Sequence, residues 1–144
     1  MQTETIPSEA TITAKQHRCF AVQAAHTDCL EALEAVEKSG DVRDFLAAGR
    51  GALSSFWAVA TRFAPATGGD IERAEAAWRL ATYWIVGEAA PRQAPRLRLM
   101  QDDRRAATRT RYLHRGLDSL KESVFWLYEA IHNADEADLP PMES

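Results

Sequence analysis

Hydrophobic residues recur every three or four positions over four stretches of this chain, which is the periodicity of an amphipathic α-helix. The first stretch follows Pro7 and Ser8, a combination typical of a helix start, and ends at Gly40. Its apolar seam consists of Cys19, Val22, His26, Cys29, Leu33 and Val36. We therefore predict one long helix before Gly40.

A second seam follows Asp41, which is a good N-cap residue, and Pro65 ends it. Its members are Val42, Phe45, Gly49, Ala52, Phe56, Val59 and Phe63. Because the connection at Gly40 is short, the first two helices are predicted to form a hairpin.

A third helix is predicted to start at an Asp70 cap, with a seam of Ile71, Ala74, Trp78, Ala81 and Ile85. The fourth is predicted from residue 102 or 103 to about Asn133, with Gly116 as a tolerated weak point. Its seam consists of Leu113, Leu117, Leu120, Val124, Leu127 and Ile131. Residues 90–100 form a connection, since the alternating segment 96–100 has no partner strand, and the acidic tail after about residue 135 is predicted to be frayed.

These elements predict an all-α, antiparallel four-helix bundle in a single domain of residues 1–144. Residues 80–86 and 125–128 are apolar on more than one side, and a bundle of this size cannot bury both segments completely. We infer a self-association surface on the third and fourth helices, and hence a homodimer, with a ligand groove as the alternative.

The charge is unevenly distributed along the chain. The net charge is −4, yet residues 92–115 hold eight arginines and only two aspartates, whereas the last 29 residues are acidic. Such a local cluster is typical of a surface that binds a polyanion. The alternative is that Arg104, Arg105 and their neighbours pair with acidic helix faces. The acidic residues concerned are Glu31, Glu34, Glu37, Asp41 and Asp44.

The sequence shows neither an export signal nor a membrane segment. The N-terminus has no basic and apolar leader, and the longest run without a charge, residues 51–61, is shorter than the roughly 20 residues of a membrane span. We therefore expect a cytoplasmic protein. Cys19 and Cys29 lie about 15 Å apart on one helix, so they cannot form a disulfide and are expected to pack as buried thiols.

Two short motifs have spacings compatible with metal binding, Glu129-x-x-His132 and His26-x-x-Cys29. A di-iron bundle needs a second Glu-x-x-His pair and further glutamates, which this chain lacks, and no nucleotide-binding glycine loop is present. We therefore expect no metal and no cofactor. His26 is expected to be a hydrogen-bonded core residue.

The arginine cluster also contains Arg109-x-x-x-x-His114. Metal-free RNA cleavage needs a group that transfers a proton near neutral pH and a fixed cation for the charge that develops on phosphorus. His114 has the chemistry of the first group and Arg109 that of the second. Residues five apart do not stack on one helical face, so a partner subunit would complete the pocket.

Residues 85–95 (IVGEAAPRQAP), followed by 104–114 (RRAATRTRYLH), resemble the toxin-type HEPN proteins. Those proteins have an IGEAA-like helix end, an arginine-rich link and an Arg-x4-His motif. The residue after the arginine is usually Asn there and is Thr110 here, and Gly116 stands where some of these toxins carry a modifiable tyrosine. The resemblance implies an all-α dimer and, in catalytic members, a metal-independent endoribonuclease.

On this reading Arg109 and His114 are catalytic, and Arg104, Arg105, Arg111 and Arg115 position the RNA backbone. Glu88 holds an arginine in place, and Thr110 supports the site. A cognate protein partner or antitoxin is a further expectation. The alternative is a non-catalytic adaptor, regulator or immunity-type module that binds protein through Trp78, Trp84, Trp126 and Tyr128.

Overall fold

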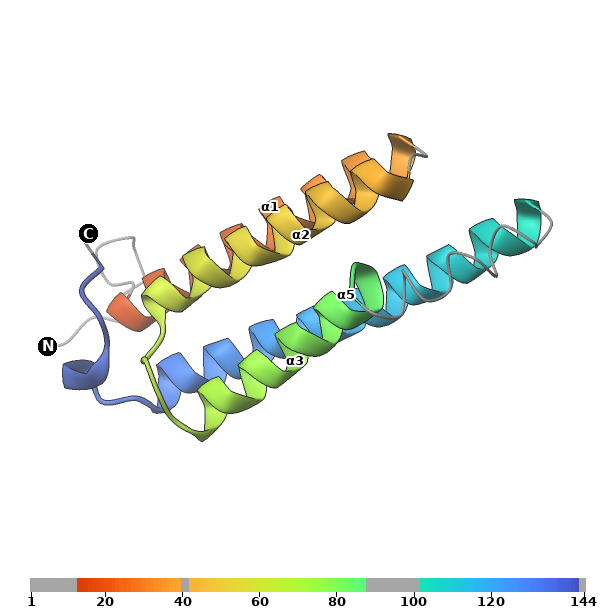
Figure 1. Cartoon of the computed structure of the whole chain (residues 1–144). Helices are drawn as coiled ribbons and strands as arrows, with labels where there is room; N and C mark the ends of the chain where they lie inside the picture. Colours follow the sequence, from red (N-terminus) through yellow and green to blue (C-terminus); the bar gives the residue numbers. More distant parts are fainter. Residues whose placement is uncertain (1–12, 40–41, 88–101, 143–144) are drawn as a thin grey trace, which may run out of the picture.

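A computed structural model describes residues 13–39, 42–87 and 102–142 of the chain (Figure 1). Within these ranges the regular structure is entirely helical, which confirms the all-α class. The α-helices are α1 (Ala14–Ser39), α2 (Val42–Ala60), α3 (Gly69–Ile85) and α5 (Asp102–Asn133), and the 3-10 turns are η2 (Thr61–Phe63) and η3 (Glu136–Asp138). The alternating segment 96–100 lies outside the described residues.

The helices are arranged as two antiparallel pairs (Figure 1). The helix α1 lies along α2, and α3 lies along α5. The two pairs pack against each other through α1 with α5 and α2 with α3, and their shared apolar side chains form the core. The first turns of α5 extend past the end of α3 (Figure 1).

The start of α1 is fixed by a reciprocal capping box. The backbone N–H of Gln16 donates to the Thr13 hydroxyl at 3.1 Å, and the Thr13 N–H donates to Gln16 Oε1 at 2.8 Å. A Thr-x-x-Gln sequence at a helix start satisfies two N–H groups that the helix itself leaves free. The helix therefore begins at Ala14, while Pro7 and Ser8, the start signal read from the sequence, lie outside the described residues.

In α2 the buried stripe is shifted from the predicted seam by one residue at two places. Leu53 and Ala60 are buried, whereas Ala52 is half-buried and Val59 is 39% exposed. The predicted seam alternates spacings of three and four residues, which corresponds to 3.5 residues per turn. A straight α-helix has 3.6 residues per turn. The stripe therefore moves around the helix as it proceeds, and Val59 faces solvent.

The cap of α3 is a glycine, and the predicted Asp70 cap is wrong. Gly68 is the N-cap residue and has φ 129° and ψ 163°. Residues other than glycine rarely adopt this backbone conformation. Asp70 lies in the first turn, where its carboxylate accepts from Arg73 at 3.2 Å and from Asn133 Nδ2 at 3.2 Å. It therefore ties the start of α3 to the end of α5.

The seams predicted for α3 and α5 agree with the observed core. Buried members are Ala74, Ala81, Ile85, Leu113, Leu120, Val124, Leu127 and Ile131. Gly116, however, is not a weak point. A Cβ at this position would lie 2.2 Å from Ile85 Cγ1 and 3.1 Å from the Ala81 carbonyl oxygen, so the absence of a side chain allows α3 and α5 to approach closely.

Ser123 is a buried polar residue that joins the same two helices. Its hydroxyl is fully buried and donates to the Ala74 carbonyl at 2.8 Å. We expect Ser123→Ala to lower the free energy of unfolding by about 1 kcal/mol, the usual value of such a hydrogen bond, as measured by urea denaturation. Ser119→Ala is the control, since Ser119 is buried on the same helix without a hydrogen bond to any described residue. Equal stabilities of the two variants would contradict the assignment.

Two cations of α1 bind the C-terminal end of the chain. Lys15 donates to the carbonyls of His132 at 3.0 Å and Ala134 at 2.6 Å. Arg18, which is only 6% exposed, donates to the carbonyls of Phe63 and Pro140. The sequence predicts a frayed tail, but the tail contains η3 and is bound to α1 at Pro140.

Candidate functional site

The predicted site residues gather on the N-terminal half of α5. His114, Thr110, Arg111 and Arg115 are all exposed there. Arg104, Arg105 and Arg109 also belong to α5, but their side chains lie outside the described structure, as does Glu88 altogether. His114 therefore lies on an open helical surface, with Thr110 and Arg111 one turn before it.

Helical geometry separates the two residues of the Arg-x4-His motif. Positions five apart on a helix differ by about 140° around its axis and by about 7.5 Å along it. Within one chain, Arg109 and His114 therefore belong to different sides of α5. A site that uses both Arg109 and His114 requires a second element that contacts both sides of α5, such as a helix of a second subunit.

An aromatic stack positions one arginine of the cluster. The Arg115 guanidinium carbon lies 4.8 Å from the centre of the Trp84 ring, and the ring of Tyr112 lies 5.7 Å from Trp84. A cation over an indole face is held by the ring's quadrupole. Trp84 on α3 thus orients a cation of α5 near His114. Sequence reasoning missed this contact, because the partners are 31 residues apart and on different helices.

The cationic surface is not neutralised within the described part of the chain. No described Asp or Glu forms an ion pair with Arg111 or Arg115, whereas Glu34, one of the acids expected to pair with the cluster, binds Lys38 at 3.2 Å. The side chains of Asp41 and Asp44 lie outside the described structure. Within the described residues, the guanidinium groups of Arg111 and Arg115 therefore have no carboxylate partner.

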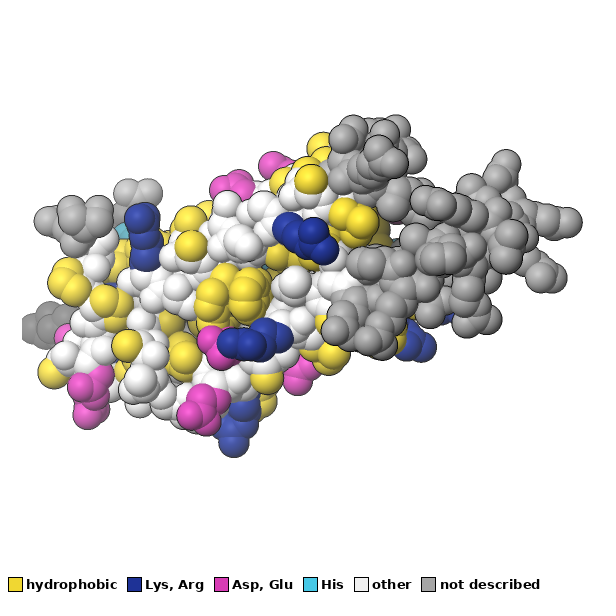
Figure 2. Space-filling view, viewed as in Figure 1, with side chains coloured by type: hydrophobic (Ala, Val, Ile, Leu, Met, Phe, Trp, Pro, Cys, Tyr) yellow, Lys and Arg dark blue, Asp and Glu magenta, His cyan; other side chains and the backbone are white. Residues whose placement is uncertain are grey.

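The large apolar side chains at the surface differ from those predicted for a protein-binding face. Trp78, Trp84, Trp126 and Tyr128 are all half-buried; Trp78 stacks on Trp57, and Arg73 lies over Trp126. The exposed residues are instead Phe20, Val59, Leu80, Tyr83, Phe125 and Met142. Figure 2 shows hydrophobic side chains along the middle of one face, with Lys or Arg side chains beside them.

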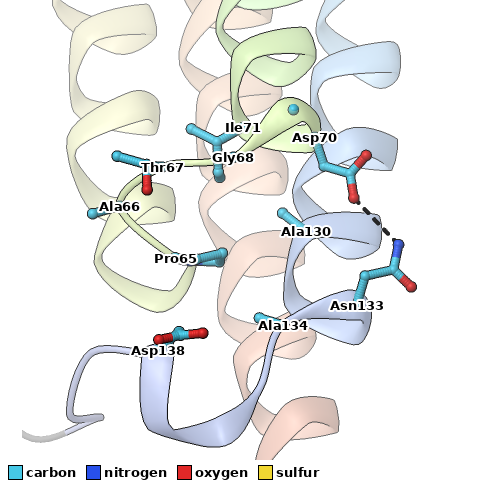
Figure 3. A pocket seen from close by; sticks show the side chains of 11 residues that line it. Pro65, Ala66, Thr67, Gly68, Asp70, Ile71, Ala130, Asn133, Ala134 and Asp138 are labelled. Atoms are coloured by element: carbon cyan, nitrogen blue, oxygen red, sulfur yellow. Dashed lines mark hydrogen bonds between the residues drawn. The ribbon is translucent and has the colours of Figure 1, made fainter.

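A separate hollow of about 400 Å³ lies at the other end of the molecule (Figure 3). The α2–α3 connection and the first turn of α3 form one wall, and the end of α5 with Asp138 forms the other. Its ionisable side chains are the carboxylates of Asp70 and Asp138, and Asp70 is already bound to Arg73 and Asn133. The residues that line this hollow include no histidine.

The four residues with metal-compatible spacing do not meet as one ligand set. His132 lies beside Cys19, with 3.7 Å between Nε2 and Sγ, while the Glu129 carboxylate accepts from Asn133 at 3.4 Å. Among described residues, no three His, Cys, Asp or Glu side chains are placed to share a metal ion.

The environments of His26 and the cysteines also differ from expectation. His26 Nε2 is buried without a hydrogen-bond partner among described residues, and its ring packs edge-on against Phe56. Burial lowers the pKa of His26, and the nearby charge of Lys121 lowers it further. Both cysteines are free, as predicted, but Cys29 is buried whereas Cys19 is only partly so.

Comparison of the chain with protein-family models, curated proteins and solved structures found no match. In the described ranges, no helix combines the length and the apolar character that crossing a bilayer requires.

Proposed function

We propose that the chain is a HEPN-like four-helix bundle that acts as a homodimer, binds RNA and cleaves it without a metal ion, as a toxin or defence ribonuclease. The observation that carries this proposal is the open surface of α5, where His114 lies exposed beside Arg111 and Arg115. A proton-transfer group next to cations that form no ion pair with a described carboxylate is the arrangement that cleavage of a phosphodiester requires.

His114 acts as the general acid or base, because an imidazole exchanges protons near neutral pH. Arg109 stabilises the charge that develops on phosphorus. Because the two belong to different sides of α5, the second subunit completes the pocket. Thr110, one turn before His114, supports the site, and Glu88 holds an arginine in place.

The other arginines bind the RNA backbone. Arg111 and Arg115 supply cations on the His114 side of α5, and Trp84 fixes the direction of Arg115. Arg104 and Arg105 belong to the same helix, and in this proposal they contribute further cations. Such contacts position RNA without reading its sequence.

Salt dependence tests the binding step. We expect the RNA affinity of the wild type to fall steeply with salt, and Arg111→Gln/Arg115→Gln to reduce the slope of log K against log salt by about 1.4, since each phosphate contact on single-stranded RNA contributes about 0.7. Arg62→Gln/Arg79→Gln is the control, because both arginines are exposed outside the cluster. A slope unchanged by the first pair would contradict the proposed RNA surface.

The second candidate is a non-catalytic module that binds a protein, such as an antitoxin or another cognate partner. Leu80 and Tyr83 on α3 and Phe125 on α5 are 46%, 37% and 50% exposed, and exposed large apolar side chains favour protein contacts. Partner binding that is insensitive to salt and lost in Leu80→Asp would support this candidate instead.

A further inference from the structure

We propose that Cys19 is a modification site that accepts small-molecule disulfides by thiol–disulfide exchange, with His132 as the base. Cys19 Sγ and His132 Nε2 lie 3.7 Å apart across the contact between α1 and α5. A nucleophile within reach of a base is the arrangement that activates a cysteine. Cys19 is partly exposed and His132 is exposed, so a small reagent can approach the sulfur.

The surrounding contacts hold this pair in place. Lys15, one turn before Cys19 on α1, donates to the carbonyl of His132 itself and to that of Ala134. These bonds fix the end of α5 against α1. Tyr128 lies one turn before His132, and burial and the nearby Cys19 raise its pKa, so it stays neutral. Glu129, three residues before His132 on α5, accepts from Asn133.

The base is required because burial raises the pKa of Cys19, which keeps the thiol protonated at neutral pH. His132 removes the proton as Sγ attacks one sulfur of the disulfide. A new S–S bond forms to Cys19, the reagent's S–S bond breaks, and the leaving thiolate takes the proton from His132. One thiol and one disulfide thus give one mixed disulfide and one new thiol.

Cys29 is an internal control on the same helix. Its side chain is 3% exposed, burial raises its pKa to about 11, and no hydrogen bond to a described side chain is found for its sulfur. A buried thiol without a base is inert toward disulfides. The two cysteines of one folded chain should therefore react at very different rates.

The test uses the full chain and the chromogenic disulfide 5,5′-dithiobis(2-nitrobenzoate) at neutral pH. In the wild type, we expect one thiol to react in a rapid phase. This rapid phase should be absent in Cys19→Ser and present in Cys29→Ser. We expect His132→Gln to slow it by at least about tenfold, and His17→Gln, at an exposed histidine of α1, to leave it unchanged.

Unfolded protein should show two equally reactive thiols, and matching circular dichroism spectra confirm that His132→Gln is folded. Equal rates for both thiols in the folded wild type, or a wild-type rate in folded His132→Gln, would overturn the proposal. The pair lies about 27 Å along α5 from His114, so this result is separate from that of the RNA experiments.

Discussion

His114→Ala is expected to lower the rate of RNA cleavage by about 10²- to 10⁴-fold, the usual contribution of a general acid or base. His114 is exposed on α5, so its removal takes no side chain from the core. The loss should therefore appear in cleavage at saturating RNA, with little change in RNA affinity or in thermal unfolding.

The matched control for this substitution is His17→Ala. His17 is also exposed on a helix, and its described ring contact is an edge-on contact with Phe20. The His17→Ala variant should cleave RNA at the wild-type rate. If His114→Ala and His17→Ala both cleave like the wild type, His114 is not the proton-transfer group.

Gly116→Ala is expected to lower the free energy of unfolding by about 1–3 kcal/mol, the typical cost of overpacking a core. The added methyl would lie 2.2 and 2.6 Å from Cγ1 and Cδ1 of Ile85 and 3.1 Å from the Ala81 carbonyl oxygen. Ile85 is only 2% exposed, so its side chain has little room to move, and the carbonyl belongs to the backbone of α3. Urea denaturation measures the effect.

Gly51→Ala provides the opposite result in the same experiment. Gly51 lies within α2, and an added Cβ would have no atom within 4 Å. We expect it to stabilise the protein by about 0.4–1 kcal/mol, because alanine loses less backbone freedom on folding than glycine. Equal effects of the two substitutions would show that α3 and α5 do not approach closely at Gly116.

The helices were predictable from the sequence because their signals are local. Glycine and proline mark the connections, and the apolar seams of α3 and α5 coincide with the buried stripes. Finer detail depended on contacts between helices. The role of Gly116 depends on Ile85, which lies on another helix and leaves no room for a side chain at this position. The Gly68 cap depends on a positive φ angle, which the pattern of side chains does not predict.

Only part of the candidate site could be predicted from the sequence. The exposed positions of Arg111 and Arg115 follow from their place opposite the apolar seam of α5, and His114 lies to one side of that seam. The stack of Arg115 on Trp84 and the approach of Cys19 to His132 could not be predicted, because each joins two helices through their relative rotation and shift. Sequence spacing constrains residues on one helix but not the register between helices.

The most direct test of the proposed function is incubation of the purified full-length protein with total RNA and tRNA in the presence of EDTA. We expect the folded wild type to cleave RNA under these conditions and preparations of Arg109→Ala and His114→Ala to leave it intact. Intact RNA after incubation with folded wild-type protein, or equal cleavage by all three preparations, would contradict a metal-independent ribonuclease site on α5.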